Sequence, residues 1–241
     1  MTPPTSPVAR LMASGTPLTW LFTGDSVTAG EQHTYGQRDF TQLFEERIRY
    51  ELGRGTDTVV NTAKSGWTAD DLSTMLDHAV LRWRPDLVIV GIGLNDCRNG
   101  EAGRDRFRTS YRGIVDRITA AGAHAILQTP NGVPPATPEA RVGALPGYVG
   151  DIRTLAAGTG CTLIDHHEVW ARAVCTGAAQ AWISEGCHPN GYGHVLMAHT
   201  LLRGLGLFDP HSHVGRLHIP YGDLAEGPYD AGGTVTPTAE R

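Results

Sequence analysis

The side chains needed for acyl transfer occur in short, separate segments of this sequence. Acyl transfer by a hydroxyl needs a nucleophile, a base that takes its proton and a carboxylate that orients the base. Ser26 is a candidate nucleophile and His188 a candidate base, and Glu185 precedes that histidine by three residues. We therefore predict a catalytic triad of these three residues, provided that the fold brings them together.

The same chemistry needs hydrogen-bond donors for the oxyanion that forms on the attacked carbonyl. The backbone N–H groups of Ser26 and Gly66 and the side-chain amide of Asn95 can supply them. Four neighbouring residues could line the substrate pocket: Asp25, His33, Tyr35 and Trp67. The alternative roles for them are turn capping, loop packing or formation of a hydrophobic wall.

These segments follow apolar runs that are typical of strands. Short apolar runs at 18–22, 58–60, 86–93, 123–127 and 161–164 predict five strands. Between or after them, apolar residues recur at helical spacing over 40–52, 68–83, 107–118 and 190–202. Strands that alternate with helices predict an α/β fold with a parallel sheet and right-handed crossovers, in the flavodoxin-like order 2-1-3-4-5. The carboxyl ends of the strands then bring the polar segments to one edge of the sheet.

Three regions lack such periodicity. Residues 1–17 contain four prolines and no apolar core segment, so we expect an N-terminal extension before a domain at 18–208. The stretch Pro130 to Gly147 is rich in proline and glycine and predicts a long loop over one end of the sheet. Residues 209–241 form a tail that either wraps over the body or stays flexible.

Composition excludes several other functions. The net charge of −5 argues against a nucleic-acid or anionic-membrane partner, and no apolar run approaches the ~18 residues of a membrane span. No secretory signal is apparent, so we expect a cytoplasmic protein with reduced thiols. None of the four cysteines forms a CxxC pair, although a bridge between Cys97 and Cys187, both beside candidate site residues, is an alternative.

No cofactor or metal is expected. The glycines after the third strand lack the third glycine of a dinucleotide turn, since Asp96 occupies that position. His166 and His167 precede Glu168 without the spacing of a zinc helix. Other histidines, His194 and His199, are better explained by packing or exposure, because a spacing of five places them on different faces of a helix.

Four blocks in order give the chain a resemblance to the SGNH, or GDSL, hydrolase family. They are Gly24-Asp25-Ser26, the glycine Gly66, Gly93-Leu94-Asn95-Asp96 and His188-Pro189-Asn190, within residues 18–202. The resemblance implies a three-layer α/β/α fold and ester hydrolysis through an acyl-serine, without metal or organic cofactor. It also implies the roles given above to Ser26, Gly66, Asn95 and His188.

One position departs from the family pattern. The family usually has an aspartate three residues before the histidine, where this chain has Glu185. Glutamate serves in other triads, but it reaches one methylene further, so its loop must retract it. Alternatively, Glu185 points into solvent and a backbone carbonyl orients His188. Asp165, at the end of the fifth strand, is a reserve candidate that looks more structural.

The sequence thus predicts a serine ester hydrolase that removes a short acyl group, with acetyl as the expected group, from a small-molecule or carbohydrate ester. Two alternatives stay open: an acyltransferase that uses the same site, and a binding relative without turnover. The oligomeric state cannot be read from the sequence.

Overall fold

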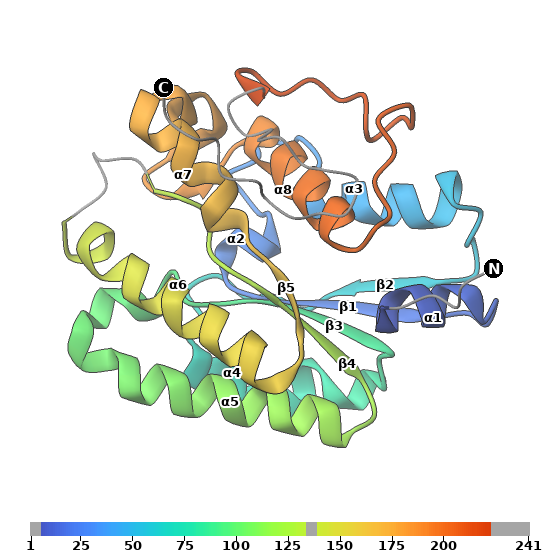
Figure 1. The fold of residues 1–241 in the computed structure, drawn as a ribbon, viewed down its shortest axis with the longest axis horizontal. Coiled ribbons are helices and arrows are strands. Elements are labelled where there is room, and N and C mark those ends of the chain that lie inside the picture. Colours follow the sequence, from blue (N-terminus) through green and yellow to red (C-terminus); the bar gives the residue numbers. More distant parts are fainter. Residues whose placement is uncertain (1–5, 134–138, 223–241) are drawn as a thin grey trace, which may run out of the picture.

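A five-stranded parallel sheet forms the centre of the computed structural model, which describes residues 6–133 and 139–222 (Figure 1). The strand order is β2-β1-β3-β4-β5, which confirms the predicted topology. The strands are β1 (Thr19–Gly24), β2 (Thr58–Asn61), β3 (Leu87–Gly91), β4 (His124–Gln128) and β5 (Thr162–Ile164). All neighbouring strands in the sheet pair in parallel. This is possible because each connection from one strand to the next along the chain carries a helix.

The neighbouring strands β1 and β3 end at the same level of the sheet, and this fixes the position of the turn that carries Ser26. Gly24 in β1 pairs in register with Gly91 in β3. The φ of Gly24 is 152°, and a Cβ there would lie 2.0 Å from the Gly91 carbonyl oxygen. Only glycine permits this approach, so Gly24 allows the chain to turn into Ser26 directly against β3.

Helices cover both faces of the sheet and complete the three predicted layers (Figure 1). One face carries α4, α5 and α6, and the other carries α3, α7 and α8. The helices are α1 (Pro7–Ala13), α2 (Ser26–Ala29), α3 (Phe40–Glu46), α4 (Ala69–Ala79), α5 (Arg104–Ala120), α6 (Glu139–Thr159), α7 (His166–Thr176) and α8 (Gly191–Gly204). Within the described ranges, no helix combines the length and apolar character needed to span a membrane.

Shorter elements connect these layers. A π-helical turn continues α3, and four 3₁₀ turns occur in the connections. They are η1 (Arg47–Glu51), η2 (Leu81–Trp83), η3 (Asp96–Asn99), η4 (Glu101–Gly103) and η5 (Ala178–Trp182). A small antiparallel hairpin precedes α8 and consists of β6 (Ile183–Glu185) and β7 (His188–Pro189).

The prediction of a loop over Pro130 to Gly147 is wrong for its second half, because α6 begins at Glu139 and contains Pro146. A proline inside a helix removes one backbone hydrogen bond. Burial of Leu145 and Tyr148 offsets that loss, and the Tyr148 ring lies 4.9 Å from the Phe107 ring on α5. Tertiary packing therefore outweighs the local propensity here. Residues 134–138 lie outside the described ranges.

The segments at the two ends of the chain contribute to the core more than the sequence suggests. The stretch expected as an N-terminal extension contains α1, which is capped by Ser6 and buries Val8. After α8, the described part of the tail packs over the body. The Val214 carbonyl accepts a hydrogen bond from His199 at 2.8 Å, and the Trp182 indole donates to Pro220 at 2.6 Å. Residues 223–241 lie outside the described ranges.

Two members of the apolar face predicted over 68–83 do not reach the core. The helix α4 ends at Ala79, and a 3₁₀ turn follows it. Met75 is 39% exposed and Trp83 is 41% exposed, whereas Leu72 and Leu76 are fully buried. Helical spacing alone does not show that Met75 and Trp83 stay at the surface of the protein.

Candidate active site

Ser26 and His188, 162 residues apart in the sequence, meet at the carboxyl edge of the sheet. The Ser26 hydroxyl lies 2.9 Å from His188 Nε2. This distance is within the reach required of a nucleophile and its general base. Ser26 is 8% exposed, so the hydroxyl lies in a partly desolvated position. The pair can therefore transfer the Ser26 proton to the imidazole as the oxygen attacks.

The turn after β1 fixes the position of Ser26. Asp25 is the N-cap of α2, and its carboxylate accepts a hydrogen bond from the Val27 N–H at 3.0 Å. Ser26 is the first helical residue, and the N–H of such a residue has no partner within its helix. The cap thus orients the turn and directs the Ser26 N–H away from the helix ladder.

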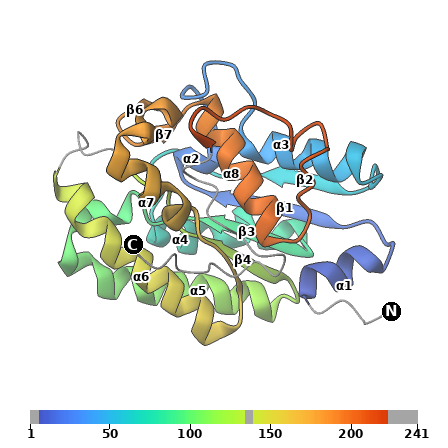
Figure 2. The same cartoon turned by 45° about the horizontal axis from the view of Figure 1, so that its top comes forward.

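The hairpin before α8 fixes the position of His188 (Figure 2). It turns at Gly186, whose φ is 54°, and Asn190 then caps α8 by accepting from the Tyr192 and Gly193 N–H groups. Asn131, fully buried after β4, donates a hydrogen bond to the Cys187 carbonyl at 3.1 Å. Asn131 is not among the residues predicted for the site, although a polar residue just after a strand end belongs to the same sheet edge.

Glu185 and His188 are paired across this hairpin, whose register shifts between Ile183 and Glu185. Residues directly opposite each other in an antiparallel pair project to the same face, so both side chains lie on the Ser26 side. The Glu185 carboxylate lies 3.1 Å from Nδ1 of His33. The His33 ring in turn stacks on the His188 ring, with centroids 3.5 Å apart and planes 4° apart. Glu185 can therefore act on the base directly or through His33, and its triad role stays a prediction.

Replacing Glu185 with glutamine tests that role. We expect roughly a 10²-fold loss in kcat, the lower end of the range for acid–base contributions, because the side chain is 66% exposed. Ester hydrolysis by the variant, by His33→Ala and by the exposed control Glu31→Gln gives the comparison. Equal losses for Glu185→Gln and His33→Ala mean that the carboxylate acts through His33. A Glu185→Gln rate equal to that of Glu31→Gln would remove Glu185 from the triad.

These three residues are also the group that could hold a metal ion in the described part of the chain. One ligand atom from each of His33, Glu185 and His188 lies within 4.8 Å of the others. An imidazole binds a metal in the plane of its ring, and two parallel stacked rings do not aim at a common point. His188 Nε2 moreover faces the Ser26 hydroxyl. The arrangement thus favours proton transfer over metal binding.

The candidate oxyanion donors lie on the neighbouring turns. The Asn95 amide nitrogen donates one hydrogen bond to the Trp67 carbonyl at 3.1 Å. An amide nitrogen carries two N–H bonds, so this contact orients the group while the second N–H can serve the oxyanion. Gly66 has a φ of 85° and lies in an exposed turn closed by the Trp67 N–H and the Lys64 carbonyl at 3.2 Å. Both roles stay predictions.

Removing the Asn95 amide is expected to slow turnover by roughly 10²–10³-fold in kcat, since each oxyanion donor contributes on this scale. The physical reason is that the amide is already oriented by Trp67 and need not reorganise as charge develops. Kinetics of Asn95→Ala on a p-nitrophenyl ester measure the loss. Asn99→Ala, an exposed asparagine on η3, is the matched control. An unchanged kcat for Asn95→Ala would exclude its amide from the oxyanion hole.

Asp96 links the Asn95 turn to α4. Its carboxylate accepts a hydrogen bond from the Ala69 N–H, at the first residue of that helix, at 2.9 Å. Burial raises the pKa of Asp96 to about 6. Asp96 is 5% exposed. Its hydrogen bond with Ala69 connects the segment that carries Asn95 to the segment that carries Gly66.

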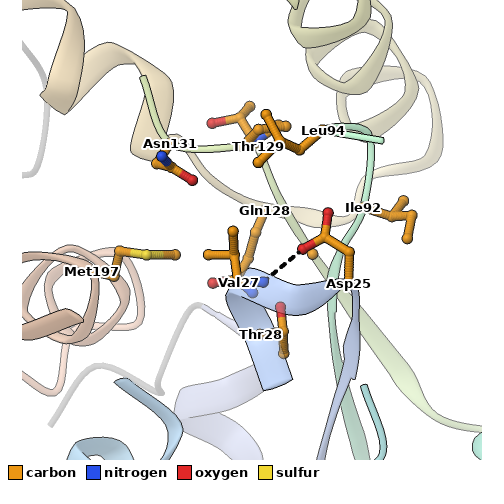
Figure 3. Close-up of a pocket in the computed structure, with 11 residues that line it drawn as sticks. Asp25, Val27, Thr28, Ile92, Leu94, Gln128, Thr129, Asn131 and Met197 are labelled. Atoms are coloured by element: carbon orange, nitrogen blue, oxygen red, sulfur yellow. Dashed lines mark hydrogen bonds between the residues drawn. The ribbon is translucent and has the colours of Figure 1, made fainter. Parts of the chain in front are cut away.

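A small cavity lies behind the nucleophile turn (Figure 3). Asp25 is buried and lines it with Val27, and Asn131 and Met197 lie across from them. Its volume of about 20 Å³ matches one water molecule. Asp25, predicted as a substrate-lining candidate, therefore faces this cavity and caps α2.

The other pocket candidates differ in their surroundings. His33 stacks on His188, the predicted base. Tyr35 is 73% exposed, with a φ of 51°, in the turn that follows α2. Trp67 is half-buried, and its carbonyl orients Asn95. The structure thus brings His33 to the predicted base His188 and Trp67 to the predicted oxyanion donor Asn95.

Several residues considered from the sequence have structural roles. Cys97 and Cys187 are buried thiols and are not bridged, so the alternative of a disulfide is wrong. Asp165 caps α7 and accepts from Arg153 at 2.7 Å and Thr129 at 3.0 Å.

The buried histidines are structural as well. His166 lies 2.8 Å from the Gln128 side chain, and His194 accepts from the Phe40 N–H at 3.2 Å. Burial lowers the pKa of His166 to about 4 and that of His194 to about 3. Both imidazoles are therefore neutral near pH 7 and already engaged.

Comparison with known proteins gives a consistent result. The model of the GDSL-like lipase/acylhydrolase family matches residues 22–196. An acetylxylan esterase from Geobacillus stearothermophilus is 25% identical over 205 residues, which cover 77% of this chain and 93% of that enzyme. An uncharacterized protein from Mycoplasma pneumoniae is 30% identical over 114 residues, which cover 45% of this chain and 13% of that protein.

Solved structures show the same fold. A catalytic mutant of Axe2, the Geobacillus stearothermophilus acetylxylan esterase, superposes with a TM-score of 0.70 at 22% identity, covering 81% of this chain and 96% of that one. LAE5, an alpha/beta hydrolase from the metagenome of Lake Arreo, gives a TM-score of 0.68 at 22% identity, with 81% and 99% coverage. Catalytic mutants of Axe2 replace an aspartate, a serine and a histidine, and that aspartate precedes the histidine by three positions.

Proposed function

We propose that this chain, a member of the GDSL-like lipase/acylhydrolase family of carboxylic ester hydrolases, removes short acyl groups from carbohydrate or small-molecule esters. Acetyl is the acyl group that we expect it to prefer. The observation that carries the proposal is the 2.9 Å contact between the Ser26 hydroxyl and His188 Nε2. The acetylxylan esterase relative supports an acetylated carbohydrate as substrate. The acid–histidine spacing of Axe2 recurs here as Glu185 and His188, with glutamate in place of aspartate.

The proposed reaction has two halves. His188 Nε2 takes the Ser26 proton as the oxygen attacks the ester carbonyl, and the Ser26 and Gly66 N–H groups and the Asn95 amide hold the oxyanion. Collapse breaks the bond to the alcohol, which leaves with the proton from His188. A water molecule then attacks the acyl-serine, again with His188 as base, and the acid is released as the Ser26 hydroxyl regains its proton.

A series of p-nitrophenyl esters of increasing chain length tests the acyl preference. We expect kcat/KM to be highest for acetate and to fall with each extension, because the proposed substrate carries acetyl groups, as the name of the acetylxylan esterase relative indicates. Product formation without an added acceptor alcohol distinguishes hydrolysis from acyl transfer. Rates that rise from acetate to octanoate would contradict the short-acyl proposal, and no turnover without an acceptor would favour the acyltransferase.

The cellular location of the protein is a separate question from its reaction. The cytoplasmic location expected from the sequence stays a prediction, supported by the absence of a bridge among the four cysteines, all of which lie within the described residues.

A further inference from the structure

A second hollow lies at the free edge of the sheet, between β2 and α4. Its volume is about 310 Å³, within the range of ligand sites. Trp67 and Lys64 line one part of it, and Met75, Arg82 and Trp83 line another. We call this hollow the edge groove. It does not include Ser26 or His188, and the reaction described above does not use it.

The edge groove contains large apolar side chains that the fold leaves uncovered. Trp83 is 41% exposed and Met75 is 39% exposed. The Arg82 guanidinium lies 5.1 Å from the centre of the Trp83 ring, a cation–π contact that holds the indole in place. Neighbouring exposed apolar side chains with a polar rim are typical of a binding surface.

The edge groove shares a loop with the predicted oxyanion hole. Lys64 and Trp67 belong to the same loop as Gly66, and the Lys64 N–H donates to the Gly24 carbonyl at 3.0 Å, beside the nucleophile turn. The Trp67 carbonyl orients Asn95 at 3.1 Å. Trp67 therefore belongs both to the loop that orients Asn95 and to the lining of the edge groove, which also includes Met75 and Trp83.

We propose that the edge groove binds the saccharide chain of an acetylated oligosaccharide, with a sugar ring stacked on Trp83. This inference rests on the proposed function. A sugar ring has apolar C–H faces that suit an indole and a rim of hydroxyls that need hydrogen-bond partners. Lys64 and Arg82 are donors at the rim, and the groove lining includes no carboxylate. Its lining thus suits neutral or acidic sugars and disfavours cationic ligands.

Hydrolysis of two substrates by Trp83→Ala tests the proposal. Acetylated xylotetraose can reach the edge groove, whereas p-nitrophenyl acetate is too short. We expect kcat/KM on the oligosaccharide to fall about tenfold, the equivalent of one lost stacking contact, mostly through KM, and by several times more than on p-nitrophenyl acetate. Tyr50→Ala, at an exposed aromatic residue outside the groove, should leave the ratio of the two rates at its wild-type value.

Binding of unacetylated xylotetraose, followed by calorimetry, gives a readout that does not need turnover. Wild type and Tyr50→Ala should bind with the same Kd, and Trp83→Ala about tenfold more weakly. Equal binding by all three proteins, or no binding, would overturn the proposal even if p-nitrophenyl acetate is hydrolysed. If that ester is not hydrolysed but xylotetraose binds through Trp83, the proposed function fails and the saccharide site stands.

Light scattering on the same samples distinguishes another occupant of the edge groove. We expect the same molar mass for wild type and Trp83→Ala. A lower mass for Trp83→Ala would mean that a second copy of the chain covers the groove, which overturns the saccharide proposal. Thermal unfolding of both variants shows that any loss of binding does not come from a loss of folding.

Discussion

Ser26→Ala is expected to abolish ester turnover, with a loss in kcat on the order of 10⁶-fold, as found when a serine nucleophile is removed elsewhere. The alanine keeps the buried turn and its Asp25 cap but removes the hydroxyl oxygen that we propose carries the acyl group. Initial rates on p-nitrophenyl acetate for the variant, wild type and the exposed-site control Ser14→Ala measure the effect.

A Ser26→Ala rate close to that of Ser14→Ala would remove Ser26 from the reaction. In that case the contact with His188 at 2.9 Å would be structural only. The thermal unfolding midpoint of Ser26→Ala should stay near that of wild type, so that the loss cannot be attributed to unfolding.

His188→Ala is expected to cost nearly as much as Ser26→Ala, because Ser26 has no other base within hydrogen-bond distance in the described residues. The two groups act as a unit, so the double variant should be no slower than either single variant. Rates of the two single variants, the double variant and His211→Ala, an exposed histidine in the tail, complete the comparison.

Independent losses that multiply in the double variant would contradict this account. They would mean that His188 contributes through packing on His33 rather than through the Ser26 proton. A normal rate for His188→Ala alone would contradict the assignment of the base.

The parts of the fold that could be predicted from the sequence are those with strong local signals. The apolar run of β3 requires burial on both faces, and polar residues after strand ends must gather at one sheet edge. Both inferences need only the periodicity and the rule that parallel strands end on one side. Hence the sequence alone places Ser26 and Asn95 at the carboxyl edge of the sheet.

What could not be predicted depends on contacts between distant segments. The helix α6 contains Pro146, and it is stabilised by the burial of Leu145 and by the packing of Tyr148 against Phe107 and the Gly100 carbonyl. The exposure of Trp83 depends on how α4 sits at the sheet edge, which helical spacing does not reveal.

The surroundings of the base were equally inaccessible to sequence reasoning. Glu185 precedes His188 by three residues, but the stacked His33 ring comes from a loop more than 150 positions earlier. Asn131, which holds the Cys187 carbonyl, has no motif around it. Each depends on a loop conformation, and local spacing carries no information about such contacts.

Covalent labelling of the nucleophile tests the central claim most directly. The protein is treated with a fluorophosphonate and digested, and the modified peptide is sequenced by mass spectrometry, with Ser26→Ala treated in parallel. The account predicts one modified residue, Ser26, with loss of ester hydrolysis in proportion to labelling and no adduct on Ser26→Ala. An adduct on another residue, or full hydrolytic activity in protein fully labelled at Ser26, would contradict it.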